Sequence, residues 1–396
     1  MRLAVTIVII TLGASGMFVV PVVLPPVQAE FGVSRAAASA PYTLLMIGFG
    51  LGGLVMGRLS DRYGMQLPLV IGAVLLGLGF AIAAKAPDIW TFNLVHGLLI
   101  GTGCSATFSP LLADTSLWFE KRRGIAVAIC ASGNYVGGAL WPPIVQHFVE
   151  TVGWRQTYMG MALVVVASVV ALSFAMRARA PVARAVDSPH NAHPSSRPFG
   201  LTPRSAQVLL CIAGLACCVA MSMPQVHIVA YCGDLGYGTA AGAQMLSLML
   251  ACGIVSRLVS GVICDHIGGL RTLLLGSVLQ GVALLLFLPF KGLVSLYVIS
   301  ALFGLFQGGI VPSYTIIVRE YFEPREAGAR VGAVIMCTLF GMALGGWMSG
   351  RIFDATGSYQ AAFLNGIGWN LLNLAIAYTL LTRTRRPAQA VPAHGS

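Results

Sequence analysis

Twelve long apolar stretches, each bounded by charged or turn-forming residues, dominate this chain of 396 residues. Each has about 20 residues, which is the length that an α-helix needs to cross the hydrocarbon core of a bilayer. A helix satisfies its own backbone hydrogen bonds, so such stretches fold as helices in lipid. We therefore expect an all-α membrane protein with twelve transmembrane helices. The predicted spans are 3–27, 38–59, 67–85, 89–113, 123–148, 155–176, 205–231, 239–263, 270–290, 293–318, 326–351 and 360–382.

Charge is scarce in the chain and unevenly placed. Only 9 % of the residues are charged and 57 % are hydrophobic, against roughly 25 % charged in an average soluble domain. If the amino terminus is cytoplasmic, most Lys and Arg residues fall on the cytoplasmic side, which is the positive-inside pattern. Topology thus accounts for the net charge of +11, and we expect the lipid bilayer, not nucleic acid, as the partner. The predicted location is the plasma (inner) membrane, multi-pass, with both termini cytoplasmic.

An internal repeat with one constant offset runs through the chain. Glycine, aspartate and glycine recur in three pairs, which are Gly57 and Gly261, Asp61 and Asp265, and Gly64 and Gly268. Two long similar halves are the sequence mark of a transporter made of parallel repeats. We therefore expect two pseudo-symmetric six-helix bundles, 1–176 and 205–396. The segment 177–204 is rich in Arg and Pro and has no hydrophobic period, so it is predicted to be a flexible cytoplasmic linker.

The cysteines and histidines do not indicate a metal site. The nine cysteines lie mostly within apolar stretches, without the paired spacing of metal ligands or of a disulfide framework. His190 and His193 form an isolated pair in the linker, which is weak evidence for metal binding. We expect no metal, no cofactor and no enzymatic activity.

The loop after the second predicted span carries a family resemblance. Its pattern Gly57-x-Leu59-x-Asp61-Arg62-x-Gly64 resembles the signature loop between helices 2 and 3 of the major facilitator superfamily. With twelve helices, a second copy of the loop and a central linker, the resemblance covers nearly the whole chain. It implies that the loop latches the two halves on the cytoplasmic side. The candidate gating residues are Gly57, Asp61, Arg62, Gly64, Gly261, Asp265 and Gly268.

A second resemblance concerns the fifth and eighth predicted helices. The stretch from Gly133-Asn134-Tyr135 to Trp141-Pro142-Pro143 resembles the monocarboxylate-transporter-like branch, which includes oxalate–formate exchanger relatives. In that branch an arginine of helix 8 binds the substrate carboxylate, and Arg257 matches it in position. Some members carry an aspartate four residues earlier. Gly253 stands there in this chain, which argues against their proton-coupling scheme.

Arg257 is also singled out by its depth in the membrane. It lies eight residues before Asp265, or about 12 Å along a helix axis. A charge at the centre of a membrane helix costs roughly 2.5–3.5 kcal/mol and is usually retained for a pathway or a partner. The apolar parts of the first, second, fifth, seventh, eighth and tenth helices hold no acidic residue, so an anionic substrate is the simplest partner. The alternative is that Arg257 snorkels to Asp265 or to backbone carbonyls.

Other polar residues within apolar spans are candidates for substrate binding. Asn134 and Tyr135 either line a cavity or pair with a neighbouring helix. Tyr42 either faces a cavity or belongs to an interfacial aromatic belt. His227 is either a pH-sensitive group at a cavity mouth or a packing histidine. Gln307 and Tyr314, in the tenth helix, complete the predicted set.

These features predict a secondary transporter of small organic anions, above all monocarboxylates, that works by alternating access as a monomer. A proton or a counter-anion is the candidate coupled species. A multidrug or other small-molecule exporter is the alternative, but cationic drugs would need a buried carboxylate and none is evident in the sequence. A membrane sensor that does not transport is a third hypothesis, and no soluble signalling domain is appended to support it.

Overall fold

The computed structural model describes residues 2–119, 123–178 and 198–384, and these are helical with no β-strand. The helices of the first half are α1 Arg2–Gly13, α2 Ser15–Phe31, α3 Arg35–Tyr63, α4 Gln66–Ala83, α5 Ile89–Val95, a π-helical turn His96–Gly101, α6 Thr102–Ala106, α7 Ser109–Trp118, α8 Arg123–Val152 and α9 Trp154–Ser173. Those of the second half are α10 Pro203–Asp234, α11 Thr239–Ile267, α12 Gly269–Leu286, α13 Leu293–Gln307, α14 Ile310–Tyr321, α15 Pro324–Thr356 and α16 Tyr359–Thr384.

The twelve predicted spans all reappear as helical rods in the described part of the chain. Three rods consist of consecutive helices, namely α1 with α2, α5 to α7, and α13 with α14. Eleven rods in the described ranges are long and apolar enough to cross a membrane. The twelfth is α16, whose 26 residues are also long enough to span. The prediction of an all-α multi-pass membrane protein is confirmed.

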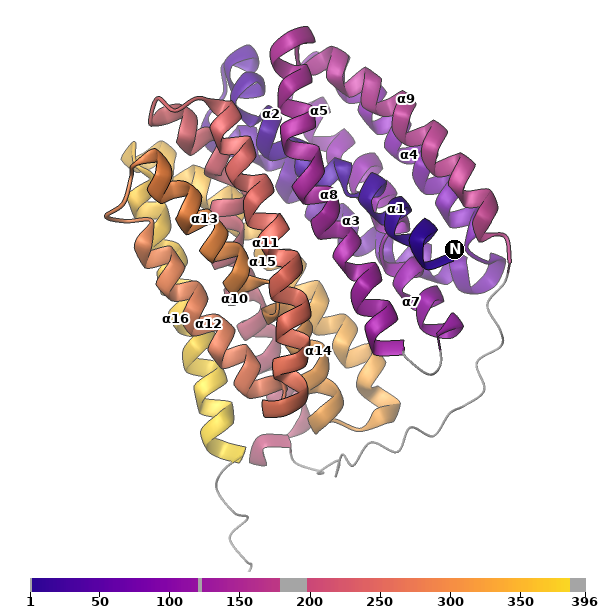
Figure 1. The fold of residues 1–396 in the computed structure, drawn as a ribbon, viewed down its shortest axis with the longest axis vertical. Coiled ribbons are helices and arrows are strands. Elements are labelled where there is room, and N and C mark those ends of the chain that lie inside the picture. Colours follow the sequence, from indigo (N-terminus) through magenta and orange to yellow (C-terminus); the bar gives the residue numbers. More distant parts are fainter. Residues whose placement is uncertain (1, 120–122, 179–197, 385–396) are drawn as a thin grey trace, which may run out of the picture.

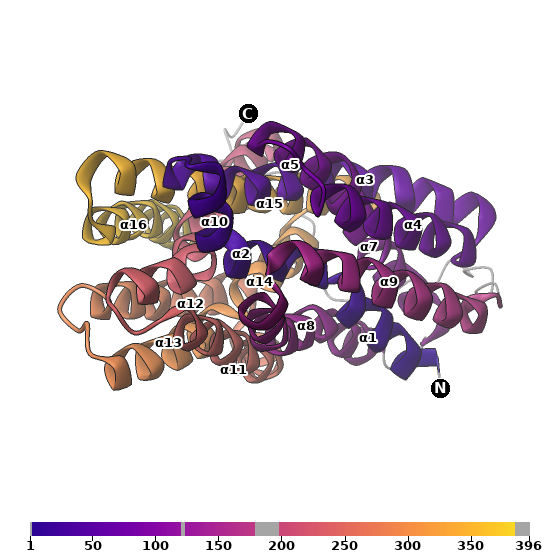
Figure 2. The ribbon, with the colours of Figure 1, turned by 90° about the horizontal axis from the view of Figure 1, so that it is seen from above.

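The rods form two bundles that lie side by side, the first made of α1 to α9 and the second of α10 to α16 (Figures 1 and 2). Residues 179–197 of the predicted linker, with His190 and His193, lie outside the described residues. The end of that linker is already part of the second bundle. Phe199 is buried against Tyr321, with ring centroids 4.4 Å apart, and Thr202 caps α10 by accepting a hydrogen bond from the Ser205 N–H.

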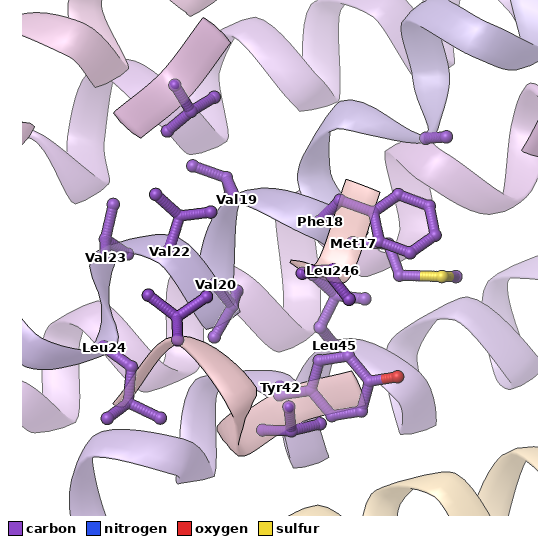
Figure 3. Packing of buried hydrophobic residues seen from close by; sticks show 14 of the residues in the cluster. Met17, Phe18, Val19, Val20, Val22, Val23, Leu24, Tyr42, Leu45 and Leu246 are labelled. Carbon is purple, nitrogen blue, oxygen red and sulfur yellow. The ribbon is translucent and has the colours of Figure 1, made fainter. Parts of the chain in front are cut away.

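Two helices occupy the centre of the molecule. α2 contacts α3 and α8 of its own bundle and α10 and α11 of the other. Figure 3 shows Val19, Val20 and Leu24 of α2 packed in one cluster with Leu45 of α3 and Leu246 of α11. α10 occupies the corresponding place in the second half and is buried without interruption from Ala216 to Cys232. These helices are apolar all round because each has packed neighbours on every side.

The repeated glycines have a backbone reason. Gly64 ends α3 and Gly268 ends α11, with φ of 85° and 82°. In both, the N–H donates to the carbonyl four residues back, of Ser60 and Cys264, at 2.8 Å. Residues other than glycine rarely adopt a positive φ of this size. The repeated glycines therefore reflect one backbone conformation, which ends a helix in each half.

We expect Gly64→Ala and Gly268→Ala each to destabilise the protein by about 1–3 kcal/mol, the cost of holding a non-glycine residue in this region. Gly57→Ala is the matched control. Gly57 lies inside α3, and apart from its own helix no described residue has a heavy atom within 4 Å of a Cβ added there, so alanine should be neutral or slightly stabilising. Thermal unfolding of detergent-purified variants measures the difference. Equal melting temperatures for Gly57→Ala and Gly64→Ala would contradict the backbone argument.

The two bundles touch at one end and separate toward the other, here called the Arg35 end and the Asp61 end after the residues of α3 that lie there. At the Arg35 end, a Cβ added to Gly350 of α15 would lie 2.8 Å from Ala36 Cα of α3. Gly50, midway along α3, still meets Met336 Sδ of α15 at 2.8 Å from its added Cβ. Gly57, two turns further on the same face, meets nothing within 4 Å among the described residues. The space between the bundles therefore opens toward the Asp61 end.

Candidate functional site

Arg257 lies on the side of α11 that contacts α8. Its Nη1 donates to the Ala131 carbonyl of α8 at 3.2 Å, and its Cζ lies 4.6 Å from the ring centroid of Tyr135. The Tyr135 ring in turn packs on Gly253, one turn before Arg257 in α11, where an added Cβ would be 2.5 Å from Tyr135 Cε1. The side chain of Arg257 thus reaches from the second bundle to the first.

The guanidinium of Arg257 has fewer partners than its five N–H groups can serve. Its Nε is buried without a hydrogen bond. The four ion pairs of the described residues belong to Arg2, Arg35, Arg155 and Arg330. No described carboxylate, Asp265 included, lies within 4 Å of Arg257. Of the two snorkelling partners considered from the sequence, only a backbone carbonyl is observed.

Further unpaired polar atoms lie on helices that pack against α11. Asn134 of α8 has a buried Oδ1 without a partner. Gln307 of α13 accepts a hydrogen bond from Gln225 Nε2 of α10 at 3.1 Å, while its own Nε2 is buried and unpaired. The Gly308 N–H donates to Ser256 Oγ at 3.1 Å, which joins α13 to the turn of α11 that carries Arg257. The junction of α8, α11 and α13 is therefore the candidate site, and Gln225 is a member that the sequence did not single out.

Three predicted binding residues are placed elsewhere. Tyr314 is fully buried in the second bundle and donates to Asn373 Oδ1 at 2.8 Å. His227 is also fully buried, and its Nε2–H donates to the Gly346 carbonyl at 2.8 Å while Nδ1 accepts from Tyr359 O–H at 3.2 Å. Both side chains have their hydrogen-bond partners without a ligand. The packing interpretation of His227 therefore fits the structure, and a position at a cavity mouth does not.

Tyr42 lies at the seam between the bundles. Its side chain is 3 % exposed, so it does not face lipid as a belt tyrosine would. A Cβ added to Gly346 of α15 would lie 3.3 Å from its Cδ1, and Figure 3 shows its ring beside Leu45. It packs across the seam, apart from the contacts of Arg257.

A group of charged residues that the sequence did not single out closes the Arg35 end. Arg35 Nη2 donates to both carboxylate oxygens of Asp234 in α10, at 3.0 and 3.1 Å. The backbone N–H groups of Arg35 and Ala36 donate to the Asp354 carboxylate of α15, at 2.8 and 2.9 Å. Arg35 Cζ also stacks 4.8 Å from the Phe353 ring. These contacts, named the outer clasp below, bind the first turn of α3 to the second bundle.

The predicted gating loops are not joined in this structure. Asp61 and Asp265 are exposed, and neither makes an ion pair with another described residue within 4 Å. Arg62 stacks on the neighbouring Tyr63 ring at 5.3 Å. This agrees with the separation of the bundles at the Asp61 end, and the latch stays a prediction.

Comparison with known proteins decides the family. The family model described as Major Facilitator Superfamily matches residues 5–295 and 246–396. The chain belongs to the Major Facilitator Superfamily. Among curated relatives of this superfamily member, monocarboxylate transporter 13 of Bos taurus is 28 % identical over 331 residues, covering 83 % of this chain and 76 % of the relative. The MFS-type transporter opdF of Penicillium oxalicum is 26 % identical over 338 residues, covering 82 % and 76 %.

Solved structures agree on the superfamily fold. The nucleoside transporter NupG aligns over 97 % of this chain and 100 % of its own, with a TM-score of 0.77 and 14 % identity. A bacterial homologue of the human lysosomal transporter Spinster, in an inward-facing and unoccupied conformation, covers 98 % of both chains with a TM-score of 0.72 and 13 % identity. The predicted superfamily and the resemblance to monocarboxylate transporters are confirmed.

Proposed function

We propose that this superfamily member is a secondary transporter of small organic anions, above all monocarboxylates. One observation carries the proposal, namely the position of Arg257 within the membrane span, where it has one carbonyl partner and no carboxylate partner among the described residues. A guanidinium binds a carboxylate through two parallel hydrogen bonds. A substrate carboxylate would supply the negative charge that no residue in the described ranges supplies there. The monocarboxylate transporters among the relatives support this class of substrate.

An exporter of cationic drugs would need the opposite arrangement. A cation bound within the membrane requires a carboxylate near the site. The paired carboxylates of the described residues, such as Asp114 with Arg2 and Asp234 with Arg35, lie toward the ends of their helices and already hold partners. The junction of α8, α11 and α13 presents an arginine and amides. The arrangement therefore favours an anionic substrate.

Alternating access is the mechanism that these contacts support. The bundles are in contact at the Arg35 end and apart at the Asp61 end, and Arg257 lies on α11, which packs against the other bundle. With the positive-inside assignment, the Asp61 end and both termini are cytoplasmic. In the opposite state the outer clasp would be broken. The loop of Asp61 would then contact the second bundle, and the loop of Asp265 would contact the first. The protein would work as a monomer in the plasma membrane.

Uptake by proteoliposomes tests the proposal. The purified protein is reconstituted, and labelled acetate, lactate, pyruvate, oxalate and succinate are compared with lactamide as the neutral control. Uptake of at least one acid, without uptake of lactamide, is expected. A pH gradient that drives uptake indicates proton coupling, whereas acceleration by unlabelled acid inside indicates anion exchange. Uptake of a cationic dye with no uptake of any acid would refute the proposal.

Asp61→Asn is expected to lower the rate of transport several-fold while leaving the thermal stability of the substrate-free protein unchanged. Asp61 makes no ion pair in the state described here, so its loss costs nothing in this state. It would remove a charge that the closed Asp61 end needs, which shifts the balance between the two states. Uptake at equal reconstituted density measures the rate. A rate equal to that of the parent would show that Asp61 does not act as a latch.

A further inference from the structure

Three residues on two helices hold the guanidinium of Arg257. Ala131 and Tyr135 stand one turn apart on α8, and Gly253 and Arg257 stand one turn apart on α11. The Ala131 carbonyl accepts from Nη1 at 3.2 Å. The Tyr135 ring lies between Gly253 and the guanidinium, 4.6 Å from Cζ. Two pairs at helical spacing therefore face each other across the seam.

Gly253 makes room for that ring. A Cβ added at Gly253 would lie 2.5 Å from Tyr135 Cε1 and 2.6 Å from Cδ1, closer than non-bonded carbons approach. Any other residue at this position would push the ring away from α11. The three heavy atoms nearest to that added Cβ all belong to the Tyr135 ring.

The hydroxyl of Tyr135 makes no hydrogen bond with a described residue, whereas its ring face is in contact with a cation. A flat guanidinium stacked on an aromatic face keeps its N–H edge free to bind a carboxylate. Fixing the side chain in this orientation before the substrate arrives lowers the entropy lost on binding.

We propose that Tyr135 and Gly253 are positioning residues for the substrate-binding arginine, with Gly253 serving as the seat of the Tyr135 ring. This rests on the proposed role of Arg257 in carboxylate binding. The ring holds the guanidinium stacked, and the incoming carboxylate takes the place of the Ala131 carbonyl. Tyr135 acts through Arg257 by its ring face and does not bind the substrate through its hydroxyl.

A readout without substrate separates this inference from the proposed function. Phenylglyoxal modifies accessible guanidinium groups, and mass spectrometry gives the rate at Arg257, with exposed Arg351 as the internal reference. Loss of a cation–π contact changes the equilibrium between the stacked and the released Arg257 side chain by roughly 2- to 30-fold. We therefore expect a faster reaction at Arg257 by that factor in Tyr135→Leu and in Gly253→Ala. Tyr135→Phe keeps the ring and should react as the parent does.

The double variant Gly253→Ala/Tyr135→Leu supplies the matched control. Without a ring to displace, the added methyl group has nothing to act on, so the double variant should react no faster than Tyr135→Leu alone. In lactate uptake, KM should rise in Tyr135→Leu and Gly253→Ala and return to the parent value in Tyr135→Phe. A rise in KM for Tyr135→Phe equal to that for Tyr135→Leu would overturn the inference in favour of a hydroxyl role. An unchanged Arg257 reaction rate in Gly253→Ala would overturn it too, even in a protein that transports no acid.

Discussion

Replacing Arg257 by glutamine is expected to abolish binding of the transported acid, and replacing it by lysine is expected to impair binding severely. Removing one member of a desolvated charge pair typically costs roughly 2–5 kcal/mol, or about 30- to 5,000-fold in affinity. Lysine keeps the charge but not the planar fork that grips a carboxylate with two bonds. It also loses the stacked contact with Tyr135.

Protection against thermal unfolding by the acid measures this effect on detergent-purified protein, since a ligand raises stability only by binding the folded state. Arg351→Gln is the control, because Arg351 is an exposed arginine near the Arg35 end without an ion pair among the described residues. It should keep full protection. Undiminished protection in Arg257→Gln would refute the carboxylate role, and normal binding by Arg257→Lys would mean that the arginine serves only as a charge.

Removing the carboxylate of Asp354 is expected to release the outer clasp and shift the protein toward the state that is open at the Arg35 end. Asp354 accepts two backbone N–H groups at the start of α3, where the helix dipole favours a negative charge. Loss of such a cap costs typically about 1–2 kcal/mol, and Asp354 is exposed, which limits the effect. The ratio of the two states should therefore change by roughly 5- to 30-fold in Asp354→Ala.

Amide hydrogen exchange follows both ends of the molecule at once. In Asp354→Ala, peptides covering 35–42 and 346–356 should exchange faster, and those covering 57–64 and 261–268 should exchange more slowly. Glu30→Gln is the matched control, because Glu30 pairs with Arg155 at 2.8 Å at the same end but within the first bundle. It should leave the Asp61 end unchanged. If exchange in Asp354→Ala became faster at the Arg35 end but did not change at the Asp61 end, the two ends would not be coupled.

The sequence by itself determined the helices and the places where they end. Twelve apolar stretches became twelve rods because a backbone in lipid must satisfy its hydrogen bonds within the segment. The paired glycines became paired helix ends because Gly64 and Gly268 need a φ that other residues avoid. Both constraints are local, so each can be read from a short stretch of chain. The unusual position of Arg257 could also be predicted, because its depth depends only on its place within one helix.

Only the tertiary structure decided which polar groups are paired. Tyr314 and His227 looked like binding residues in an apolar helix, but partners from other helices satisfy them. Arg35 did not stand out in the sequence, yet it meets Asp234 and, through its backbone, Asp354. Those partners lie in the other half of the chain, so nothing near Arg35 in sequence indicates them. Such contacts depend on how the two bundles pack and on which end of the seam is closed. The hydrophobic pattern of a helix fixes its length and its depth in the membrane, but it specifies neither the packing of the bundles nor the closed end.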